Sequence, residues 1–448
     1  MSPESPQSGG TRRQFLRQSG SVLCALAVAP GRGSAQGADR RRWSYDTGQP
    51  VFSSPTVVDG TVYVGSQSDR VYALDAATGE RRWEFETEGT VDGSPLVVDA
   101  AFGADRTPAR MVVVGSSDTM LYGLDPDTGR ERWRFETGGR VESSPALGGG
   151  TLFVASASDG VYAVDTATGE RRWWRELSTV SVASPTVTAD SLLLRDSDLR
   201  ALDPHTGEGR WTFDLGSGTY SSPTVANGTV FVGDRRPDAA GVAAGTVYAV
   251  DAESGEKQWA FETAEFVDTS PTVADGTVYA GGWDAAFGPA REGPGSVFAI
   301  DAVTGDREWR VATDGRVLSS PTVADGVVFI GSWDRHLYAL DAATGDRRWR
   351  FETGGEISSS PTVVDGTVYV GANDGSVYAI EADIDGSSRG SRVRRATLGH
   401  TENRSLPDRF SPSSRFDGET ARSLAVGGAA GLFAGAGLLY RGSKDSEE

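Results

Sequence analysis

The side chains best suited to chemistry are three carboxylates that occupy one position of a repeat. Asp92, Glu142 and Asp268 each stand three residues before the proline of a Ser-Pro pair. Carboxylate oxygens are the ligands that hard cations such as Ca²⁺ prefer, so this set predicts a metal site. The competing interpretation is a solvated acidic surface, because the chain has 62 acidic and 43 basic residues and a formal net charge of −19. No residue is assigned a catalytic role.

Aromatic and charged side chains gather in the long segments 233–245 and 281–295 and in the shorter segment around Trp333. Exposed loops that combine aromatic and charged residues are typical of recognition surfaces. The predicted binding surface consists of Trp283, Phe287, Arg291, Trp333 and His336, together with Tyr220 and Phe52, which occupy the same repeat position as the three carboxylates. The alternative is that the tryptophans only pack the long loops against the body of the protein.

Composition excludes several other kinds of site. The single cysteine, Cys24, cannot form an intramolecular disulfide or a thiolate zinc cluster, and the three histidines have no metal-ligand spacing. The strong negative charge argues against nucleic acid as a partner. We find no Ser/His/Asp signature and no phosphate-binding glycine loop. Acidic excess with only two lysines resembles the composition of halophilic proteins, where hydrated carboxylates maintain solubility.

A repeating unit of about 40 residues must position these side chains. Its first full copy contains four short apolar runs bounded by Gly or Asp turns, which predict four strands within 53–57, 60–65, 71–75 and 82–85. The Ser-Pro prolines lie at 55, 95, 145, 185, 223, 271, 321 and 361. Each of these prolines stands 12 residues after a tryptophan of the fourth run, and these tryptophans are Trp43, Trp83, Trp133, Trp173, Trp211, Trp259, Trp309 and Trp349.

The phase of the repeat predicts how the fold closes. The chain begins on a fourth strand, 42–45, and ends on a third strand, 376–381. A linear stack would leave bare sheet edges, whereas a ring lets the first strand complete the last unit. We therefore predict an all-β, eight-bladed β-propeller of four-stranded antiparallel blades, closed by pairing of the Trp43 strand with residues 377–380.

A motif, Asp-x-x-Thr-Gly-x-x-x-Trp, recurs with small variations and has an architectural explanation. Its aspartate accepts hydrogen bonds from turn amides, its glycine adopts positive φ, and its indole fills the gap between blades. A catalytic role would require seven simultaneous sites, so we interpret the aspartates as structural: Asp75, Asp125, Asp165, Asp203, Asp251, Asp301 and Asp341. The eight tryptophans are likewise predicted to be structural.

These motifs resemble the tryptophan-docking repeats of quinoprotein, or PQQ-like, β-propellers, over about residues 41–382. That family contains PQQ-dependent alcohol and glucose dehydrogenases and also non-catalytic scaffolds, so the resemblance implies the fold more firmly than the activity. In the dehydrogenases, PQQ lies at the channel mouth with Ca²⁺ held by Glu and Asn, an Asp base and often a cysteine pair. This chain has no cysteine pair, and Asn227 and Asn373 match only by residue type.

Both ends of the chain have the composition of targeting or linking segments. Residues 11–17, which contain Arg12-Arg13, resemble a twin-arginine export signal that spans 1–35 and includes Cys24. Residues 383–422 have little apolar periodicity and predict a flexible tether. The uncharged run 423–440 predicts a C-terminal transmembrane helix, followed by a short tail, 441–448. Gly427, Gly431 and Gly435 have the spacing that favours self-association of membrane helices.

Together these patterns favour an exported, membrane-anchored propeller outside the cytoplasm. Its predicted role is a non-catalytic binding or scaffold module for proteins or cell-surface ligands. The alternative is a PQQ- and Ca²⁺-dependent alcohol or sugar dehydrogenase that passes electrons to a membrane acceptor.

Overall fold

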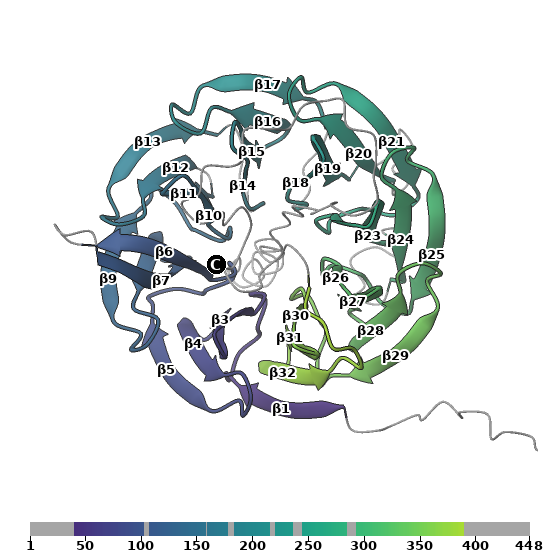
Figure 1. The fold of residues 1–448 in the computed structure, drawn as a ribbon, viewed down its shortest axis with the longest axis horizontal. Coiled ribbons are helices and arrows are strands. Elements are labelled where there is room, and N and C mark those ends of the chain that lie inside the picture. The colour runs from purple at the N-terminus through teal and green to yellow at the C-terminus, as the bar shows by residue number, and fades with distance from the viewer. Residues whose placement is uncertain are drawn as a thin grey trace, which may run out of the picture. The chain divides into compact units, whose positions relative to one another are not determined.

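The computed structural model describes residues 40–102, 107–157, 159–177, 183–215, 220–235, 244–284 and 293–388. Eight four-stranded antiparallel sheets stand around a central axis and form a β-propeller (Figure 1). The predicted fold class is thus confirmed. The described part contains strands, turns and bends and no helix.

We number the blades in chain order, with strands given from the axis outward. Blades 1 to 4 comprise β2 (Thr56–Val58), β3 (Thr61–Ser66), β4 (Arg70–Asp75), β5 (Arg81–Glu86); β6 (Leu96–Phe102), β7 (Thr107–Gly115), β8 (Met120–Leu124), β9 (Glu131–Glu136); β10 (Ala146–Gly148), β11 (Thr151–Ser156), β12 (Gly160–Asp165), β13 (Arg171–Glu176); and β14 (Thr186–Val187), β15 (Leu192–Arg195), β16 (Leu199–Leu202), β17 (Gly209–Phe213).

Blades 5 to 8 repeat this order, and the outermost strand of blade 8 is the first strand of the chain. They comprise β18 (Thr224–Ala226), β19 (Thr229–Gly233), β20 (Gly245–Asp251), β21 (Lys257–Thr263); β22 (Thr272–Ala274), β23 (Thr277–Trp283), β24 (Gly295–Asp301), β25 (Arg307–Thr313); β26 (Thr322–Ala324), β27 (Val327–Gly331), β28 (His336–Asp341), β29 (Arg347–Glu352); and β30 (Thr362–Val364), β31 (Thr367–Gly371), β32 (Ser376–Glu381), β1 (Arg41–Asp46).

The core lies between the blades, where the middle strands are buried on both faces. Strand β3, for example, is buried at all six positions, and its valines belong to a core cluster with Tyr369, Val377 and Ala379 of blade 8. The outermost strands alternate between exposed and more buried residues, because one face of each contacts solvent. This difference explains why the inner runs are almost continuously apolar in sequence while the tryptophan strands alternate.

All eight repeat tryptophans lie between blades and make the same hydrogen bond. Each indole Nε1 donates to a main-chain carbonyl of the next blade over 2.8 to 3.2 Å, as Trp83 does to Pro126. The ring packs on the turn glycine of that blade: a Cβ at Gly129 would lie 2.7 Å from Trp83. The φ of Gly129 is +70°, so this position requires glycine for conformation as well as space.

The ring closes at the strand predicted from the phase of the repeat. Strand β1 pairs with β32, with Trp43 opposite Ala379 and Tyr45 opposite Val377, and Figure 1 shows β1 as the outer strand beside β32. Trp43 Nε1 then donates to Ala76 O of blade 1 over 3.0 Å. The first strand therefore joins the last blade to the first.

A circle of hydrogen bonds around the axis, which the sequence analysis did not predict, closes the ring a second time. The serine of each Ser-Pro pair accepts a hydrogen bond on Oγ from the main-chain nitrogen of its counterpart in the preceding blade, over 2.9 to 3.1 Å: Ser54, Ser94, Ser144, Ser184, Ser222, Ser270, Ser320 and Ser360. Ser360 N donates to Ser54 Oγ, so the circle is complete. These serines are buried, which explains their invariance along the repeat.

After β32 the chain runs back across blade 8. Ser388 N donates to Val363 O over 2.9 Å, and Gly366 N donates to Gly386 O over 3.1 Å. A Cβ at Gly386 would lie 2.1 Å from a carboxylate oxygen of Asp325, so the segment fits closely between blades 7 and 8. This strap, residues 383–388, is the last described part of the chain.

Candidate functional site

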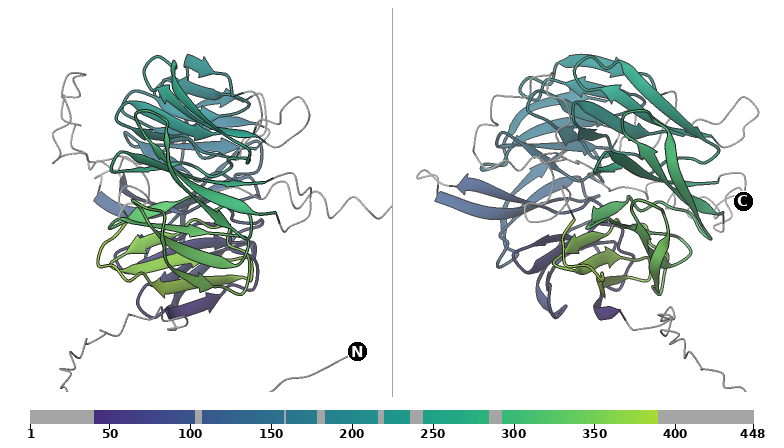
Figure 2. Two further views of the ribbon diagram at one scale, coloured as in Figure 1. Left: turned by 90° about the vertical axis from the view of Figure 1, so that its right-hand side faces the viewer. Right: turned by 45° about the vertical axis from the view of Figure 1, so that its right-hand side comes forward.

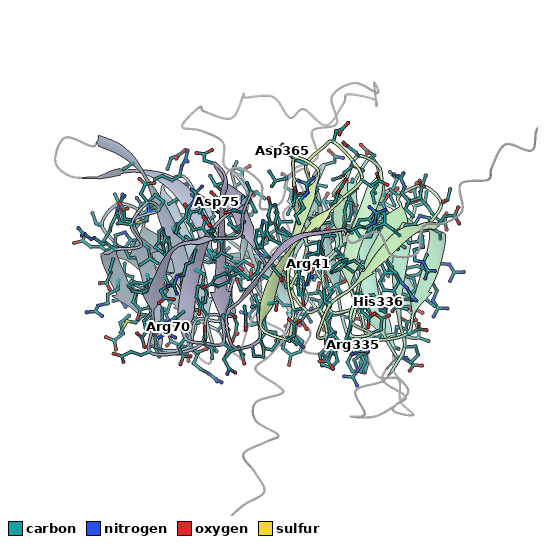
Figure 3. All side chains as sticks on the ribbon, turned by 90° about the horizontal axis from the view of Figure 1, so that it is seen from below. Arg41, Arg70, Asp75, Arg335, His336 and Asp365 are labelled. Carbon is teal, nitrogen blue, oxygen red and sulfur yellow. The ribbon has the colours of Figure 1, made fainter. Side chains whose placement is uncertain are left out.

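The propeller has two unlike faces. The loop face is formed by the connections from each outermost strand to the next innermost strand and from each second strand to the third. The turn face is formed by the connections from each first strand to the second and from each third strand to the fourth. Figure 3 shows Arg70, Arg335 and His336 on the loop face and Asp75 and Asp365 on the turn face. The strap lies on the turn face, because Asp365 N donates to Ser387 Oγ over 2.9 Å.

The residues three before each Ser-Pro proline, here called mouth positions, receive side chains from the preceding blade on the loop face. Gln67 Nε2 donates to Asp92 Oδ1 over 3.2 Å, and Trp333 Nε1 donates to Ser358 Oγ over 2.9 Å. Because both donors lie in loops between second and third strands, these loops and the mouth positions form one continuous surface.

Two of the predicted metal ligands, Asp92 and Glu142, are buried neighbours. Burial raises the pKa of Asp92, and the donors Gln67 and Thr90 offset part of that shift. Burial also raises the pKa of Glu142, with the charge of Asp92 acting in the same direction and the charge of Arg140 against it. Arg140 lies 3.5 Å from Glu142 Oε1, while Oε2 is buried and has no hydrogen-bond partner among the residues that the structure describes.

The third predicted ligand, Asp268, is engaged elsewhere. Arg235 forms a bidentate pair with it, at 2.5 Å from Nε to Oδ1 and 2.6 Å from Nη2 to Oδ2. Trp283 Nε1 also donates to Oδ2 over 2.6 Å, and the Asp268 side chain is fully buried. Among the described residues, no group of three or more His, Cys, Asp or Glu side chains is placed to hold a metal ion.

Replacing Glu142 with Gln should stabilise the protein at neutral pH. The raised pKa means that the folded state binds a proton more tightly than the unfolded state, so ionised Glu142 lowers the free energy of unfolding as pH rises through and above the ordinary carboxyl range. We expect a gain of about 1 kcal/mol at pH 7, measured by denaturant unfolding, because the neutral amide avoids the cost of burying a charge.

The gain should shrink as pH falls through the raised pKa of the native carboxyl, and it should be gone near the ordinary carboxyl pKa, where both folded and unfolded states are protonated. Glu136→Gln, at an exposed site at the end of the preceding blade, is the control and should change little. If wild type and Glu142→Gln were equally stable across the pH range, burial of the Glu142 carboxylate would not lower the free energy of unfolding.

On blades 5 to 7 the loop face carries an alternating stack of aromatic and arginine side chains. The Arg235 guanidinium carbon lies 4.8 Å from the centre of the Tyr220 ring and 5.6 Å from that of Trp283. The Arg316 guanidinium carbon lies 4.2 Å from the Trp283 ring and 5.5 Å from the Trp333 ring. We call these five residues the ladder: Tyr220, Arg235, Trp283, Arg316 and Trp333.

Main-chain contacts hold the ladder in register. Phe266 and Trp283 form an isolated β-bridge, with the Phe266 ring edge-on to the indole at 5.2 Å between centres. Trp333 N donates to Arg316 O over 2.9 Å. Rings and guanidiniums at these separations attract one another, so each rung restrains its neighbours.

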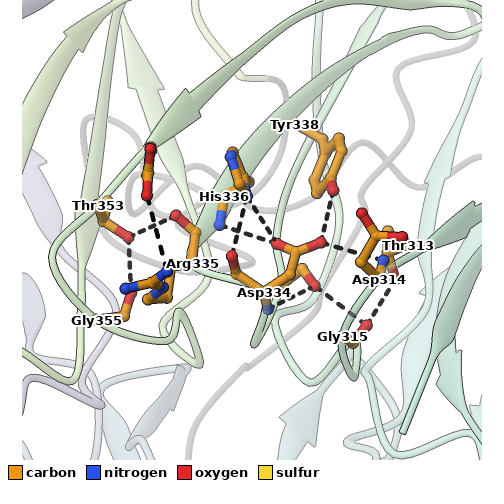
Figure 4. Close-up of polar contacts among 11 residues, drawn as sticks. Thr313, Asp314, Gly315, Asp334, Arg335, His336, Tyr338, Thr353 and Gly355 are labelled. Carbon is orange, nitrogen blue, oxygen red and sulfur yellow. Dashed lines mark hydrogen bonds and ion pairs between the residues drawn. The ribbon is translucent and has the colours of Figure 1, made fainter. Parts of the chain in front are cut away.

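The loop that carries Trp333 is organised around the Asp334 carboxylate (Figure 4). Asp334 accepts hydrogen bonds from His336 N at 3.0 Å, Tyr338 Oη at 2.6 Å and Asp314 N at 3.2 Å. The pKa of Tyr338 is raised, first by burial and then by its bond to Asp334. This network fixes the turn, so Trp333 is presented from a rigid loop.

Blade 4 departs from the repeat at Arg195. The pairing of Leu193 with Ala201 corresponds to that of Tyr63 with Ala73, which places Arg195 where blade 1 has Gly65. Arg195 is 1% exposed, and Nη1 donates to Gly233 O over 2.8 Å. Burial lowers its pKa to about 10, against the attraction of Asp234 and Asp268. A buried charge thus connects blade 4 to the base of the ladder.

The predicted binding surface is brought together only in part. Tyr220, Trp283 and Trp333 join the ladder. His336 does not: its Nδ1 lies 2.9 Å from Asp334 O. Phe52 is partly exposed at the mouth position of blade 1, and Phe287 and Arg291 lie outside the described residues.

Sequence reasoning missed Arg235, Arg316 and the supporting Phe266. A positional signal was available for one of them, because Phe266 stands five residues before a Ser-Pro proline, where other blades have Pro50, Thr90, Arg140 and Glu356. The same alignment does not single out Arg316, since Arg140 occupies the equivalent position.

The predicted export signal, most of the predicted tether, the membrane span and its three glycines lie outside the described residues. Within the described ranges, no helix is long and apolar enough to cross a membrane. The twin-arginine signal, the anchor and self-association therefore stay predictions.

Comparison with known proteins gives two family matches. The family described as outer membrane protein assembly factor BamB matches at residues 117–243, 195–287 and 243–423. The family described as glucose/ethanol/alcohol dehydrogenase, beta-propeller domain, matches at residues 35–144. No curated protein matches the chain.

Several solved structures share the fold at low sequence identity. BamB from Moraxella catarrhalis is 20% identical with a TM-score of 0.59, and the match covers 76% of this chain and 99% of that one. Quinohemoprotein alcohol dehydrogenase from Comamonas testosteroni is 19% identical with a TM-score of 0.59, covering 76% of each chain. A europium-containing methanol dehydrogenase is 16% identical with a TM-score of 0.56, covering 74% of this chain and 85% of that one. These likenesses establish the propeller fold.

Proposed function

This chain belongs to the BamB family of PQQ-like β-propellers, and on that premise we propose that it is an exported, membrane-anchored, non-catalytic binding or scaffold module. Its loop face binds a protein or cell-surface ligand. The observation that carries this proposal is the ladder, whose three aromatic rings and two guanidiniums depart from the repeat on one sector of one face. Function in repeat proteins resides in such departures, because the repeat itself builds the scaffold.

The path of the strap supports an orientation for this module. Ser388 lies on the turn face, hydrogen-bonded to innermost strand β30. Any attachment through the residues that follow would therefore leave from the face opposite the ladder. A membrane anchor at the predicted place, 423–440, would leave the loop face free to meet a partner.

The alternative, a PQQ- and Ca²⁺-dependent dehydrogenase, rests on the two buried carboxyl groups of Asp92 and Glu142. Both residues fall within the segment that matches the dehydrogenase propeller family. Ca²⁺ takes six to eight oxygen ligands, and the predicted three-carboxylate set does not fit it, since Asp268 is neutralised by Arg235. We derive no catalytic step through these groups.

A cofactor titration decides between the two functions. We expect the purified protein, in high salt with Ca²⁺, to show neither saturable PQQ binding by cofactor fluorescence nor dye-linked oxidation of alcohols and aldoses. A Ca²⁺-free sample and a known quinoprotein dehydrogenase serve as controls. Saturable binding with turnover would overturn the binding-module proposal and make Asp92 and Glu142 the first residues to replace.

A further inference from the structure

The first hairpin tip of blade 5 departs from the repeat. A two-residue connection, Asn227-Gly228, joins β18 to β19, and both residues are exposed. Four other blades have Asp-Gly at this connection, and their aspartates are Asp59, Asp275, Asp325 and Asp365. Figure 3 shows Asp365, the counterpart in blade 8, on the turn face. The Asn227 tip therefore lies on the face opposite the ladder.

The geometry of the turn does not explain the asparagine. Asn227 has φ +50° and Gly228 has φ +76°, as in a type I′ turn, and Asp275 has φ +49° at the same place in blade 6. Aspartate thus builds this turn as well as asparagine does. A Cβ at Gly228 or at Gly276 would meet no described atom within 4 Å, so both tips project into open space. The asparagine of blade 5 needs a reason outside the turn.

That reason is the sequence Asn227-Gly228-Thr229, which is an Asn-x-Thr acceptor for N-linked glycosylation. The chain has only three asparagines, so an asparagine in this turn is not a matter of abundance. Three of the four Asp-Gly copies are also followed by threonine, but they lack the side-chain amide nitrogen to which a sugar is attached. Replacement of one carboxylate by an amide therefore creates the acceptor in blade 5 alone among these turns.

The threonine hydroxyl of this copy is held more weakly than its counterparts. Thr229 Oγ1 donates to Gln258 Oε1 over 3.0 Å, an exposed hydrogen bond between two neutral groups. In blades 1, 3 and 8 the counterpart accepts from an arginine, as Thr61 does from Arg82 Nη1 over 2.5 Å. Charge-assisted hydrogen bonds are about twice as strong as neutral ones. A transferase that recognises the hydroxyl therefore displaces the weaker bond in blade 5.

The acceptor is also reachable in the folded propeller. The predicted twin-arginine route carries proteins already folded, so a transferase outside the membrane meets the finished blade. The exposed tip of a hairpin belongs to the parts of a protein that open locally at low cost. The tip can open while β18 and β19 stay paired further along, where Thr224 lies opposite Phe231.

Resting on the export in the proposed function, we propose that Asn227 carries an N-linked oligosaccharide. A bond forms between Asn227 Nδ2 and C1 of the first sugar, while the bond from C1 to the phosphate oxygen of a lipid-phosphate-linked oligosaccharide breaks. The lipid phosphate leaves with the proton that the amide loses. The glycan projects from the turn face and leaves the ladder uncovered.

The test is mass spectrometry of the full chain purified from membranes of the native cells. Trypsin releases residues 211–235, a peptide whose single asparagine is Asn227. We expect this peptide to carry an added mass that fragments into sugar units and that is attached at Asn227. Thr229→Ala should abolish the added mass, whereas Thr229→Ser, which keeps the hydroxyl, should retain it.

Two further variants keep the result interpretable. Asn227→Asp reproduces the turn of four other blades, so it should lose the glycan and keep the circular dichroism spectrum of the wild type. Asn373→Gln is the matched control, because Asn373 is followed two residues later by Gly375 and begins no acceptor sequence. It should leave the glycan on Asn227 unchanged.

The proposal is overturned if peptide 211–235 of the exported protein is unmodified or only deamidated, if a glycan is confined to Asn403 of the second acceptor sequence, or if the glycan on Asn227 survives Thr229→Ala. Export is measured separately, by labelling of the exposed Lys257 in intact cells with a membrane-impermeant amine reagent.

The proposed function and the glycan fail separately. A labelled protein without the glycan would leave export standing and overturn the inference, and an unlabelled protein without the glycan would overturn both. A protein with the glycan that crosslinks to no partner would leave the inference standing and overturn the binding module.

Discussion

Deletion of residues 41–47 is expected to lower the melting temperature by about 10 °C while leaving a folded ring. The deletion removes β1 and with it Trp43, which is 8% exposed and bonds Ala76 O, and Thr47, whose hydroxyl donates to Gly375 O over 2.9 Å. Loss of one docked tryptophan alone costs about 3 to 5 kcal/mol. The edge of β32 is exposed in addition.

The ring should persist because the axial serine circle does not involve β1. Ser360 N still donates to Ser54 Oγ, and Thr362 Oγ1 to Pro55 O over 2.7 Å. A chain that begins at Arg40 is the matched control and should melt like the full chain. Calorimetry in high salt measures the difference in melting temperature. Unchanged melting of the deletion variant would show that the pairing of β1 with β32 does not stabilise the ring.

Replacement of Arg235 with Met is expected to cost about 3 to 5 kcal/mol of unfolding free energy. The Asp268 side chain is fully buried and Arg235 supplies two of its hydrogen bonds, so the substitution leaves a buried charge with much of its compensation gone. Removing one partner of a buried ion pair is costly because the remaining charge cannot regain its hydration. Denaturant unfolding in high salt measures the loss.

A double-mutant cycle separates this pairing from the packing of Arg235 on Tyr220. Asp268→Asn added to Arg235→Met removes the uncompensated charge and should restore much of the stability. The exposed pair Arg81–Glu84 is the control, where Arg81→Met should cost less than about 1 kcal/mol. A double mutant no more stable than Arg235→Met would show that the cost arises from packing.

The fold was predictable from sequence because its determinants are local and repeated. Tryptophan, turn glycine and aspartate recur at fixed spacing, and each makes the same contact in successive blades: Asp75 Oδ1 accepts from the amides of Ala77 and Thr78. The bond from Arg82, followed by that from Thr78, lowers the pKa of Asp75 to about 2. The phase of the repeat sufficed to predict the pairing of β1 with β32. The serine circle could not be recognised, because it depends on neighbouring blades meeting at the axis.

The site was predicted less well, because its contacts join loops of unlike length. Asp268 has the same repeat position as Asp92 and Glu142, but of the three only Asp268 forms a bidentate pair with an arginine, and Arg235 comes from a loop 33 residues earlier. Equivalent positions therefore have opposite electrostatic surroundings. Tyr220, Trp283 and Trp333 were predicted from sequence as members of a binding surface, and Trp283 is buried within the ladder. The arginines between them could be assigned only from the packing of three blades.

Site-specific photocrosslinking in the native cells measures which face of the propeller meets a partner. Benzoylphenylalanine replaces Asp314, an exposed loop-face residue two positions from Arg316, or His205, an exposed residue of a turn-face connection. We predict discrete, reproducible protein or glycan adducts from position 314 and none from position 205. Adducts from both positions alike, or from position 205 alone, would show that the loop face is not the partner-binding face.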